Sequence, residues 1–441
     1  MPPSIAATDM TASKHRSTRH VEKAQASGLV KRSLAILGPG LITGAADDDP
    51  SGISTYSVAG AAFGYATLWI ALLTFPLMAA VQLMCARLGI VTGRGLGAAI
   101  RSNYPRWVLW GACSILVLAN VINIGADLGG MAEATQLVTG IRALICIPLY
   151  ALFILALLFW SSYQLIARIF KWMTLVLFAY VFASFCAHVD WKHALVVTFV
   201  PHLDGSRGFL AVLVAILGTT ISPYLFFWQA AEEVEEERTK GGTLAQRKGA
   251  TGRELRNARA DTVTGMFFSN LIMYFIILTT AATLHAHGQT DITTARQAAE
   301  ALRPLAGNGA YLLFTFGLIG TGMLGVPVLV GSCAYAVAEG AAWRGSMADK
   351  PKSARKFYAV MAVAMALGLA LNYLGFNAVK MLFGSAVING LLAPPLILLV
   401  ILLTSSRKVM GKQVNPPLLK YLGWATLAVM TAAMVGMLVT S

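Results

Sequence analysis

The sequence predicts an all-α, polytopic membrane protein in which ten transmembrane helices form two inverted repeats of five and an eleventh helix follows them. Composition is the first reason: 57% of the 441 residues are hydrophobic, 12% are charged and the mean hydropathy is +0.67, which is too apolar for a soluble globular protein. Apolar runs of about 17 to 25 residues, long enough to cross a bilayer, recur along the chain. The first and sixth runs are both interrupted by proline and small polar residues, and such paired interruptions are typical of inverted repeats.

The eleven predicted spans are the apolar runs at residues 34–62, 66–88, 108–132, 143–161, 165–187, 209–231, 261–283, 310–338, 357–376, 379–403 and 419–439. Residues 33–187 then form the first repeat, residues 209–403 form the second, and residues 404–441 contain the eleventh helix. We expect an extracytoplasmic loop at 188–208 and a charged cytoplasmic loop at 232–260, in which the glutamates of 232–237 form a solvated helix end. Residues 1–32 are polar and basic and lack the apolar core of a signal peptide, so they predict a disordered cytoplasmic tail.

The formal net charge of +14 follows the predicted membrane topology. If the N-terminus is cytoplasmic, all but six of the 34 lysines and arginines fall on the cytoplasmic side. The six on the opposite side are Arg142, Lys192, Arg207, Arg296, Arg303 and Lys380. The positive-inside rule therefore predicts a multi-pass protein of the cell membrane, as in a bacterial inner membrane, with a cytoplasmic N-terminus and an extracytoplasmic C-terminus. This distribution accounts for the basicity without a nucleic-acid partner.

The first span carries three consecutive carboxylates, Asp47, Asp48 and Asp49, followed by Pro50 and Gly52. A carboxylate in hydrocarbon costs roughly 2.5 to 3.5 kcal/mol unless it faces a cavity or a cation. Pro50 removes a backbone donor and disfavours helix at the residue before it. These features predict a helix that is broken at mid-membrane, with a cation site at the break. Asp49 could also cap the outer half-helix, a role that is compatible with cation binding.

The sixth span repeats this anomaly, because Thr219, Ser222 and Pro223 stand at its centre. Irregular backbone at that depth is tolerated only where it lines a cavity or is buried in protein. Two discontinuous helices of this kind are expected to meet at the bilayer midplane and to build the substrate site from unwound backbone and helix ends.

The third span contains Asn120, Asn123 and Asp127, which recur at i, i+3 and i+7 and therefore share one helical face. This face is expected to point toward protein or water rather than lipid. Glu133 falls off the face in a straight helix and is a candidate cation attractor near the outer mouth.

The paired motifs resemble those of the NRAMP family of divalent-metal transporters, over residues from about Ser33 to Leu402. The first helix of that family carries Asp-Pro-Gly-Asn, and the sixth carries Met-Pro-His. The resemblance implies a LeuT-type fold of five plus five helices, with helices 1 and 6 broken. It also implies that Asp49 of the segment Asp49-Pro50-Ser51-Gly52 is the principal charged ligand of a transported ion.

Several positions depart from the family pattern. Gly52 stands where the family has its Asn ligand, Ser222 where it has the Met thioether and Tyr224 where it has the His. The resemblance further matches Thr219 to a backbone-carbonyl ligand and Gln229 to a second His of helix 6. It matches Asp127 and Asn389 to polar positions of helices 3 and 10. The residues expected to line the cavity are Tyr224, Trp228, Gln229, Asp127 and Asn389. Tyr224 and Trp228 could instead be packing residues.

These departures change the expected cargo. A thioether favours soft transition-metal ions, whereas Mg²⁺ prefers oxygen and usually keeps several of its waters. Replacing Met by Ser222 and Asn by Gly52 removes the soft contact and leaves room for a partly hydrated ion. The pattern resembles the NRAMP-related magnesium transporter branch, which implies uncoupled uptake of Mg²⁺, and also of Mn²⁺, by alternating access. A divalent cation that enters at an inside-negative potential of about 100 mV gains about 4.6 kcal/mol, so accumulation does not require proton coupling.

The predicted metal ligands are thus Asp49, Gly52, Thr219, Ser222, Asp48 and Glu133, although Asp47 and Asp48 could instead line the inner vestibule. We expect a divalent metal ion and the lipid bilayer as partners, a monomeric transport unit and no cofactor. One alternative is a proton-coupled Mn²⁺ or Fe²⁺ importer, and a second is an amino-acid transporter of the same fold, in which Asp49 would repel the substrate carboxylate. A non-transporting metal sensor is a further alternative, but no cytoplasmic segment is long enough for a signalling domain. A membrane enzyme is disfavoured because the sequence shows no nucleophile, base and partner residue at one membrane depth.

Overall fold

A computed structural model describes residues 38–161, 175–239 and 249–440. The predicted tail at 1–32, the start of the fifth span at 165–174 and part of the charged loop at 240–248 lie outside these residues. The described residues contain helices and turns and no β-strand, as the composition predicts.

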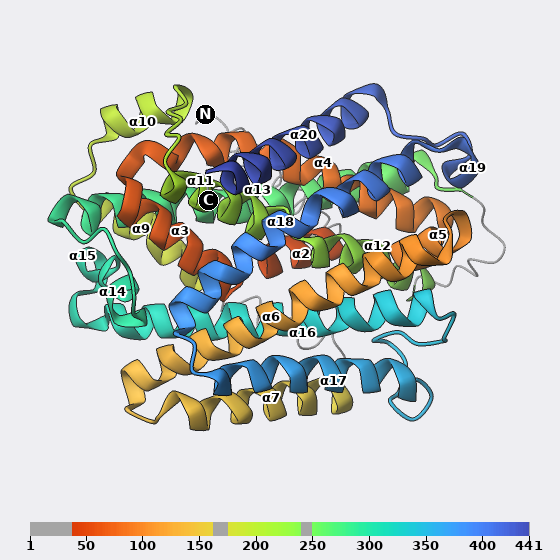
Figure 1. The fold of residues 1–441 in the computed structure, drawn as a ribbon, viewed down its shortest axis with the longest axis horizontal. Helices are drawn as coiled ribbons and strands as arrows, with labels where there is room; N and C mark the ends of the chain where they lie inside the picture. Colours follow the sequence, from red (N-terminus) through yellow and green to blue (C-terminus); the bar gives the residue numbers. More distant parts are fainter. Residues whose placement is uncertain (1–37, 162–174, 240–248, 441) are drawn as a thin grey trace, which may run out of the picture. The chain divides into compact units, whose positions relative to one another are not determined.

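The long helices correspond in order to the predicted spans (Figure 1). They are α2 (Pro39–Asp47), α3 (Pro50–Phe63), α4 (Leu68–Thr92), α6 (Arg106–Thr139), α7 (Ala143–Trp160), α9 (Phe178–Cys186), α11 (Arg207–Thr220), α12 (Pro223–Thr239), α13 (Gly252–Thr283), α16 (Ala310–Gly340), α17 (Arg355–Leu371), α18 (Ala378–Ser405) and α20 (Pro417–Val439). Shorter helices connect them: α5 (Leu96–Asn103), α10 (Trp191–Phe199), α14 (Ala295–Glu300), α15 (Arg303–Ala306) and α19 (Arg407–Met410).

Nine stretches of the described chain are long and apolar enough to cross a membrane, or ten if the bent pair formed by residues 175–186 and 191–199 counts as one span. These stretches are fewer than the eleven predicted spans because two of the predicted spans are joined. The chain passes from α3 into α4 through a short 3₁₀ turn, so the two helices form one apolar stretch of 43 residues, and α2 is too short to qualify alone. The first span is thus the pair α2 and α3, and the second is α4.

Both predicted helix breaks are present. α2 ends at Asp47 and α3 begins at Pro50, with Asp49 as the capping residue in extended conformation and Pro50 at the first helical position, where its missing N–H costs nothing. α11 ends at Thr220 and α12 begins at Pro223. The sequence therefore predicted the position of each break correctly, because proline and short polar residues end an apolar helix at that point.

The broken helices lie at the centre of the fold and pack against α13, α16 and α18. Close approach depends on glycine: a Cβ on Gly40 would lie 2.6 Å from the Cα of Thr262, and a Cβ on Gly218 would lie 2.7 Å from the Cα of Gly390. Such contacts between backbones are typical of helix packing in membranes, where small residues allow close van der Waals contact. In Figure 1, α7 and α17 lie side by side at one edge of the bundle, where they contact each other and α6.

Two predicted loops contain regular structure. Residues 191–199 of the expected extracytoplasmic loop form α10, and α12 continues through the glutamates at 232–237 to Thr239. The prediction of a solvated helix end was wrong for Glu233, which is 4% exposed and accepts a hydrogen bond from the Gln229 side chain at 2.9 Å. The physical reason is that α12 packs against α4 and α16, which covers one face of the acidic turn.

Candidate metal site

Asp49 is held at the first break by the helix that it caps. Its Oδ1 atom accepts hydrogen bonds from the backbone N–H of Gly52 at 2.8 Å and from the Ser51 hydroxyl at 2.6 Å. This is the standard arrangement of an acidic N-cap, in which a carboxylate satisfies backbone donors at the positive end of the helix dipole. The carboxylate is 1% exposed, so it lies inside the protein and not at its surface.

The second break faces the first through Gly52. A Cβ on Gly52 would lie 3.3 Å from the Thr219 Oγ1 atom and 3.3 Å from the carbonyl oxygen of Asp47. The Ser222 hydroxyl turns back on its own helix and donates to the carbonyl of Thr219 at 2.7 Å or that of Gly218 at 2.8 Å. The two breaks are therefore adjacent, and the room expected beside Gly52 is taken up by the close approach of α3 and α11.

Tyr224 joins the two breaks. Its hydroxyl donates to the carbonyl of Ala46 at 3.0 Å and lies 3.3 Å from the Oδ2 atom of Asp49. The side chain is fully buried, and the backbone carbonyl of Tyr224 accepts a hydrogen bond from Ser332 of α16 at 3.0 Å. A residue that could have been a packing residue thus contacts the principal carboxylate.

Asp47 and Asp48 both contact α13. The Ser269 hydroxyl lies 2.6 Å from Asp47 Oδ2 and 3.2 Å from Asp48 Oδ1, and it can donate its one proton to only one of them. Both carboxylates are almost fully buried, and Asp47 Oδ1 has no hydrogen-bond partner. Asp47 and Asp48 therefore share a partner on α13, whereas Asp49 has its partners on α3.

Asp127 approaches Asp49 from α6. The Cβ of Asp49 and the Oδ2 atom of Asp127 are both within 4 Å of the position that a Cβ on Gly325 would take. Asp127 is fully buried, and neither of its carboxylate oxygens has a hydrogen-bond partner. Buried polar groups without partners are rare, and they mark sites at which an ion, a water or a proton completes the structure.

Three buried asparagines lie on α6 and α18, and two of them have no hydrogen-bond partner for their side-chain amides. Asn389 of α18 is buried with both amide atoms unpartnered, next to Gly390, which contacts Gly218 of α11. Asn123 of α6 is likewise buried and unpartnered. Asn120 donates to the carbonyl of Leu329 at 2.9 Å, so it connects α6 to α16.

Gln229, Trp228 and Glu133 are not at the break. The Thr43 hydroxyl of α2 lies 2.6 Å from Gln229 Oε1 and 2.7 Å from the carbonyl of Pro39, and it can donate its one proton to either, so Gln229 contacts α2 from α12. Trp228 packs on α16, where a Cβ on Gly331 would lie 2.8 Å from its ring. Glu133 is six residues beyond Asp127, or about 9 Å along the axis of α6, and lies near the backbone N–H of Ala378 at the start of α18.

Asp261 of α13 was not among the predicted site residues. Its carboxylate accepts from the backbone N–H groups of Gly40 at 2.6 Å and Leu41 at 3.2 Å, so it binds the N-terminal end of α2. The available signal was a lone acid at the start of an apolar run, which has that position whether it faces water or another helix. Ser269 carried no signal at all.

The chemistry of the break is that of oxygen ligands. Carboxylates come from Asp49 and Asp127, a hydroxyl comes from Ser222, and backbone carbonyls come from Thr219 and Asp47. No group of three His, Cys, Asp or Glu side chains converges in the residues that the structure describes. The Met131 thioether lies against Gly322 of α16, where a Cβ on Gly322 would also lie 3.2 Å from the Pro50 ring. Because Asp49, Thr219 and Ser222 are each 1% exposed, the site is closed to solvent in this structure.

Comparison with known proteins gives matches along nearly the whole chain. The family model "Nramp: Natural resistance-associated macrophage protein-like" matches residues 40–440. The divalent metal cation transporter MntH of Klebsiella pneumoniae is 29% identical over 421 residues, which cover 93% of this chain and 95% of that protein. MntH of Brucella suis is 26% identical over 412 residues, with 92% and 87% covered.

Solved structures support the fold. A manganese transporter of Eremococcus coleocola superimposes with a TM-score of 0.75 at 20% identity, covering 92% of this chain and 86% of that one. MhsT in complex with L-phenylalanine superimposes with a TM-score of 0.58 at 11% identity, covering 91% and 97%. These likenesses confirm the predicted LeuT-type fold.

Proposed function

Since the chain belongs to the Nramp family of divalent metal cation transporters, we propose that it carries Mg²⁺, and also Mn²⁺, into the cytoplasm as an uncoupled uniporter. It is a multi-pass membrane transporter of divalent metal cations and not an enzyme. The proposal concerns the identity of the ion, the absence of proton coupling and the alternating-access mechanism.

The observation that supports Mg²⁺ is the set of atoms around Asp49. The Tyr224 hydroxyl of the second break lies 3.3 Å from Asp49 Oδ2, and the Thr219 Oγ1 atom lies beside Gly52, so the side-chain atoms that the second break places next to Asp49 and Gly52 are oxygens. Oxygen ligands with one or two carboxylates suit Mg²⁺, whereas thioethers select softer ions. In this proposal Asp49 is the main charged ligand, and Thr219, Ser222, the Gly52 backbone and waters complete the shell.

The burial of the site supports the proposed alternating access. A cation cannot reach a carboxylate that is 1% exposed unless helices around it move. The half-helices α2 and α12 are in contact through Thr43 and Gln229, and α2 is bound to α13 by Asp261. In the proposed cycle these contacts open toward the inside, while α3 and α11 part toward the outside.

Uncoupled uptake is consistent with energetics. At an inside-negative potential of about 100 mV, two charges gain about 4.6 kcal/mol, which corresponds to a gradient of roughly three orders of magnitude. No histidine is present at the second break, where Tyr224 stands.

A flux assay in proteoliposomes tests the proposal. We expect Mg²⁺ entry that Mn²⁺ inhibits and Ca²⁺ does not, with no change of a pH dye inside the vesicles. Asp49→Ala abolishes entry, whereas Asp291→Asn, which changes an exposed carboxylate in a connecting segment, leaves it unchanged. Wild-type entry by the Asp49 variant, or Mn²⁺ entry without Mg²⁺ entry, contradicts the proposed ion.

The predicted orientation is part of the proposal. In a Cys186→Ser background, which removes the exposed native cysteine, Lys412→Cys in the exposed segment before α20 should react with impermeant maleimide only from the cytoplasmic side. Labelling from outside in right-side-out vesicles would invert the topology.

One observation favours the alternative of a Mn²⁺ or Fe²⁺ importer. The Met131 thioether lies one helical turn beyond Asp127 on α6 and packs at Gly322, which also meets Pro50. If this sulfur became a ligand in another conformation, Met131→Leu would reduce Mn²⁺ entry and spare Mg²⁺ entry. Acidification of the vesicles during metal entry would support proton coupling. The amino-acid alternative has no such support, since the likeness to MhsT is one of fold alone.

A further inference from the structure

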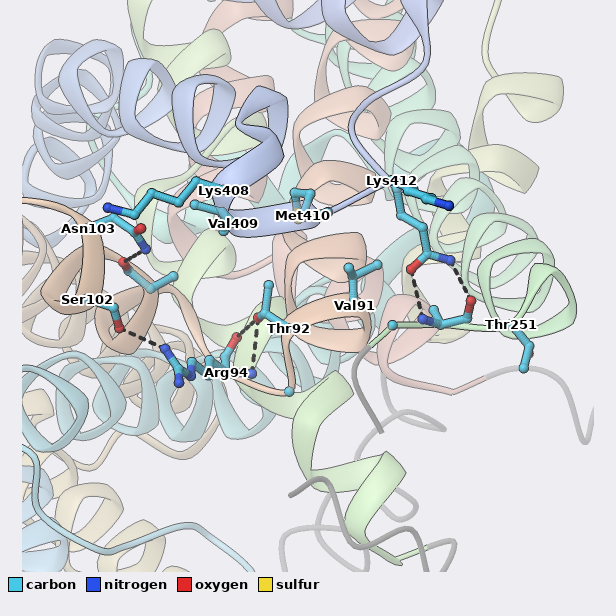
Figure 2. Close-up of a pocket in the computed structure, with 16 residues that line it drawn as sticks. Val91, Thr92, Arg94, Ser102, Asn103, Thr251, Lys408, Val409, Met410 and Lys412 are labelled. Atoms are coloured by element: carbon cyan, nitrogen blue, oxygen red, sulfur yellow. Dashed lines mark hydrogen bonds between the residues drawn. The ribbon is translucent and has the colours of Figure 1, made fainter. Parts of the chain in front are cut away.

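A cavity of about 1150 Å³ lies away from the two breaks, where the ends of several helices meet (Figure 2). Its lining comes from the end of α4 at 91–94, from α5 at 99–103, from the segment 249–251 before α13 and from residues 408–413 around α19. These segments are far apart in the sequence. None of the residues that form the candidate metal site lines this cavity.

Hydrogen bonds fix the walls of the cavity. The Gln413 side chain accepts from the backbone N–H of Ala250 at 2.8 Å and donates to the carbonyl of the same residue. Arg87 of α4 donates to the carbonyls of Gln413 at 2.9 Å and Val414 at 3.1 Å. The segment after α19 is therefore tied both to α4 and to the start of α13, so the cavity has a defined shape and is not a gap between loose segments.

The lining is cationic. Arg94, Lys408 and Lys412 contribute three positive charges, all three side chains are exposed to solvent, and no Asp or Glu is among the lining residues. Figure 2 shows Lys408 and Arg94 at the end that also holds Asn103 and Ser102, with Lys412 at the opposite end. Arg94 donates to the Ser102 hydroxyl at 3.0 Å, a contact that leaves its charge without a carboxylate partner among the described residues.

We propose that this cavity binds an anion that carries a phosphate group. The Thr92 and Ser102 hydroxyls donate to the carbonyls of Leu88 and Ala98, and Asn103 donates one amide proton to the carbonyl of Ala99. The donors left for phosphate oxygens are therefore the three cations and the second amide proton of Asn103. The lining also includes Val409, which is partly exposed, and the buried side chains of Val91 and Met410, so apolar residues lie beside the charges. A phospholipid headgroup with its attached chains has this combination, whereas free phosphate uses only the polar part.

The position of the cavity favours the lipid source. It lies where α4 ends and where α18 gives way to α19, so the bilayer interface is expected at this level. The charge distribution predicts that this end is cytoplasmic, and anionic lipids of that leaflet attract basic residues with about 1 kcal/mol for each Lys or Arg near the surface. This corresponds to about fivefold in affinity for each charge.

Native mass spectrometry of the full-length protein tests the proposal. After purification with a mixture of phosphatidylglycerol and phosphatidylcholine, we expect the wild type to retain phosphatidylglycerol selectively. Lys408→Gln and Arg94→Gln should each reduce retention about fivefold, and the pair more, whereas Lys352→Gln, which removes an exposed charge between α16 and α17, should not. A second arm measures whether inorganic phosphate or pyrophosphate raises the melting temperature of lipid-free protein, and whether the same variants remove the effect.

Each result decides the question. Selective retention that falls in Lys408→Gln and Arg94→Gln supports the site with a lipid as its source, and protection by phosphate alone supports the site with a soluble source. Equal retention of both lipids together with no protection by phosphate overturns the proposal, as does equal behaviour of the cavity variants and the Lys352 variant. Because the wild-type comparison requires no substitution and no metal flux, it is independent of variant folding and of the proposed function.

Discussion

Asp49 caps α3 and is also the proposed charged ligand of the ion, and two substitutions can separate these roles. Asp49 caps α3 through Oδ1, which accepts from Gly52 N–H and from Ser51. Asp49→Asn retains an oxygen acceptor at this position and removes the charge. Asp49→Ala removes both. The two variants should therefore have the same transport defect and different stabilities.

The magnitudes follow from the contacts. Loss of an N-cap costs about 0.5 to 2 kcal/mol, and asparagine is as good a cap as aspartate. Asp49→Ala should therefore lower the melting temperature of the ion-free protein, whereas Asp49→Asn should leave it unchanged or raise it, because it also removes a buried charge. Removing one partner of a buried charge pair costs about 2 to 5 kcal/mol, so both variants should bind Mg²⁺ roughly 30-fold to several thousand-fold more weakly.

The assay is thermal unfolding in detergent across a series of Mg²⁺ concentrations. Ligand binding stabilises the wild type in proportion to the logarithm of the ion concentration above its dissociation constant, and this Mg²⁺-dependent increase should disappear in both variants. Asp291→Asn serves as the control and should retain it. A Mg²⁺-dependent increase of wild-type size in Asp49→Asn would refute the assignment of Asp49 as the charged ligand, and equal ion-free stabilities of the Asn and Ala variants would refute its role as a cap.

Three further predictions concern the surroundings of the site. Ser222→Met places a thioether at the second break, as in the family pattern, and should increase the inhibition of Mg²⁺ entry by Mn²⁺ several-fold. Ser222→Ala serves as the control and should not increase it. Unchanged inhibition by Mn²⁺ in Ser222→Met would contradict the argument from ligand softness. Asp261→Ala removes a charged acceptor of two backbone N–H groups, and each of these hydrogen bonds is worth about 1.5 to 3 kcal/mol. Amide hydrogen exchange in α2 should therefore be faster in this variant than in the wild type, while exchange in α17 should not change. The same exchange rates in α2 for variant and wild type would show that Asp261 does not hold α2. Gly218→Ala should destabilise the protein by about 1 to 3 kcal/mol, since the added Cβ meets the backbone of Gly390, whereas Gly384→Ala on α18 meets nothing within 4 Å and should be neutral or stabilising in the same melting experiment.

The broken helices could be predicted from sequence because few structures allow proline and carboxylates inside an apolar run. Asp49 and Pro50 specify a helix end, and Thr219 to Pro223 specify another, whatever the rest of the chain does. Helical periodicity was likewise sufficient to place Asp127 on the buried face of α6, where the structure has it.

The partners of the other polar residues could not be predicted, because they depend on tertiary contacts over long sequence separations. Asp47 and Asp48 face Ser269, which is more than 200 residues away, and Gln229 faces Thr43. Hydropathy also gave no reason for α12 to continue beyond the bilayer. Glutamate is a good helix former, so the helix extends through the acidic run as far as packing against α4 and α16 supports it.

The hydrogen bonds at Asp49 also set its denticity. Oδ1 is committed to two donors of α3, so Oδ2 is the oxygen that remains for an ion, and the Tyr224 hydroxyl near it lies closer to the carbonyl of Ala46. As the ligand of the proposed ion, a carboxylate constrained in this way would bind through one oxygen. Mg²⁺ forms compact octahedral shells to which each carboxylate contributes one oxygen, whereas Ca²⁺ takes six to eight ligands and accepts bidentate carboxylates. Discrimination against Ca²⁺ would then begin with the capping of a helix, because the bonds that hold α3 in place also withhold the second oxygen from the larger ion.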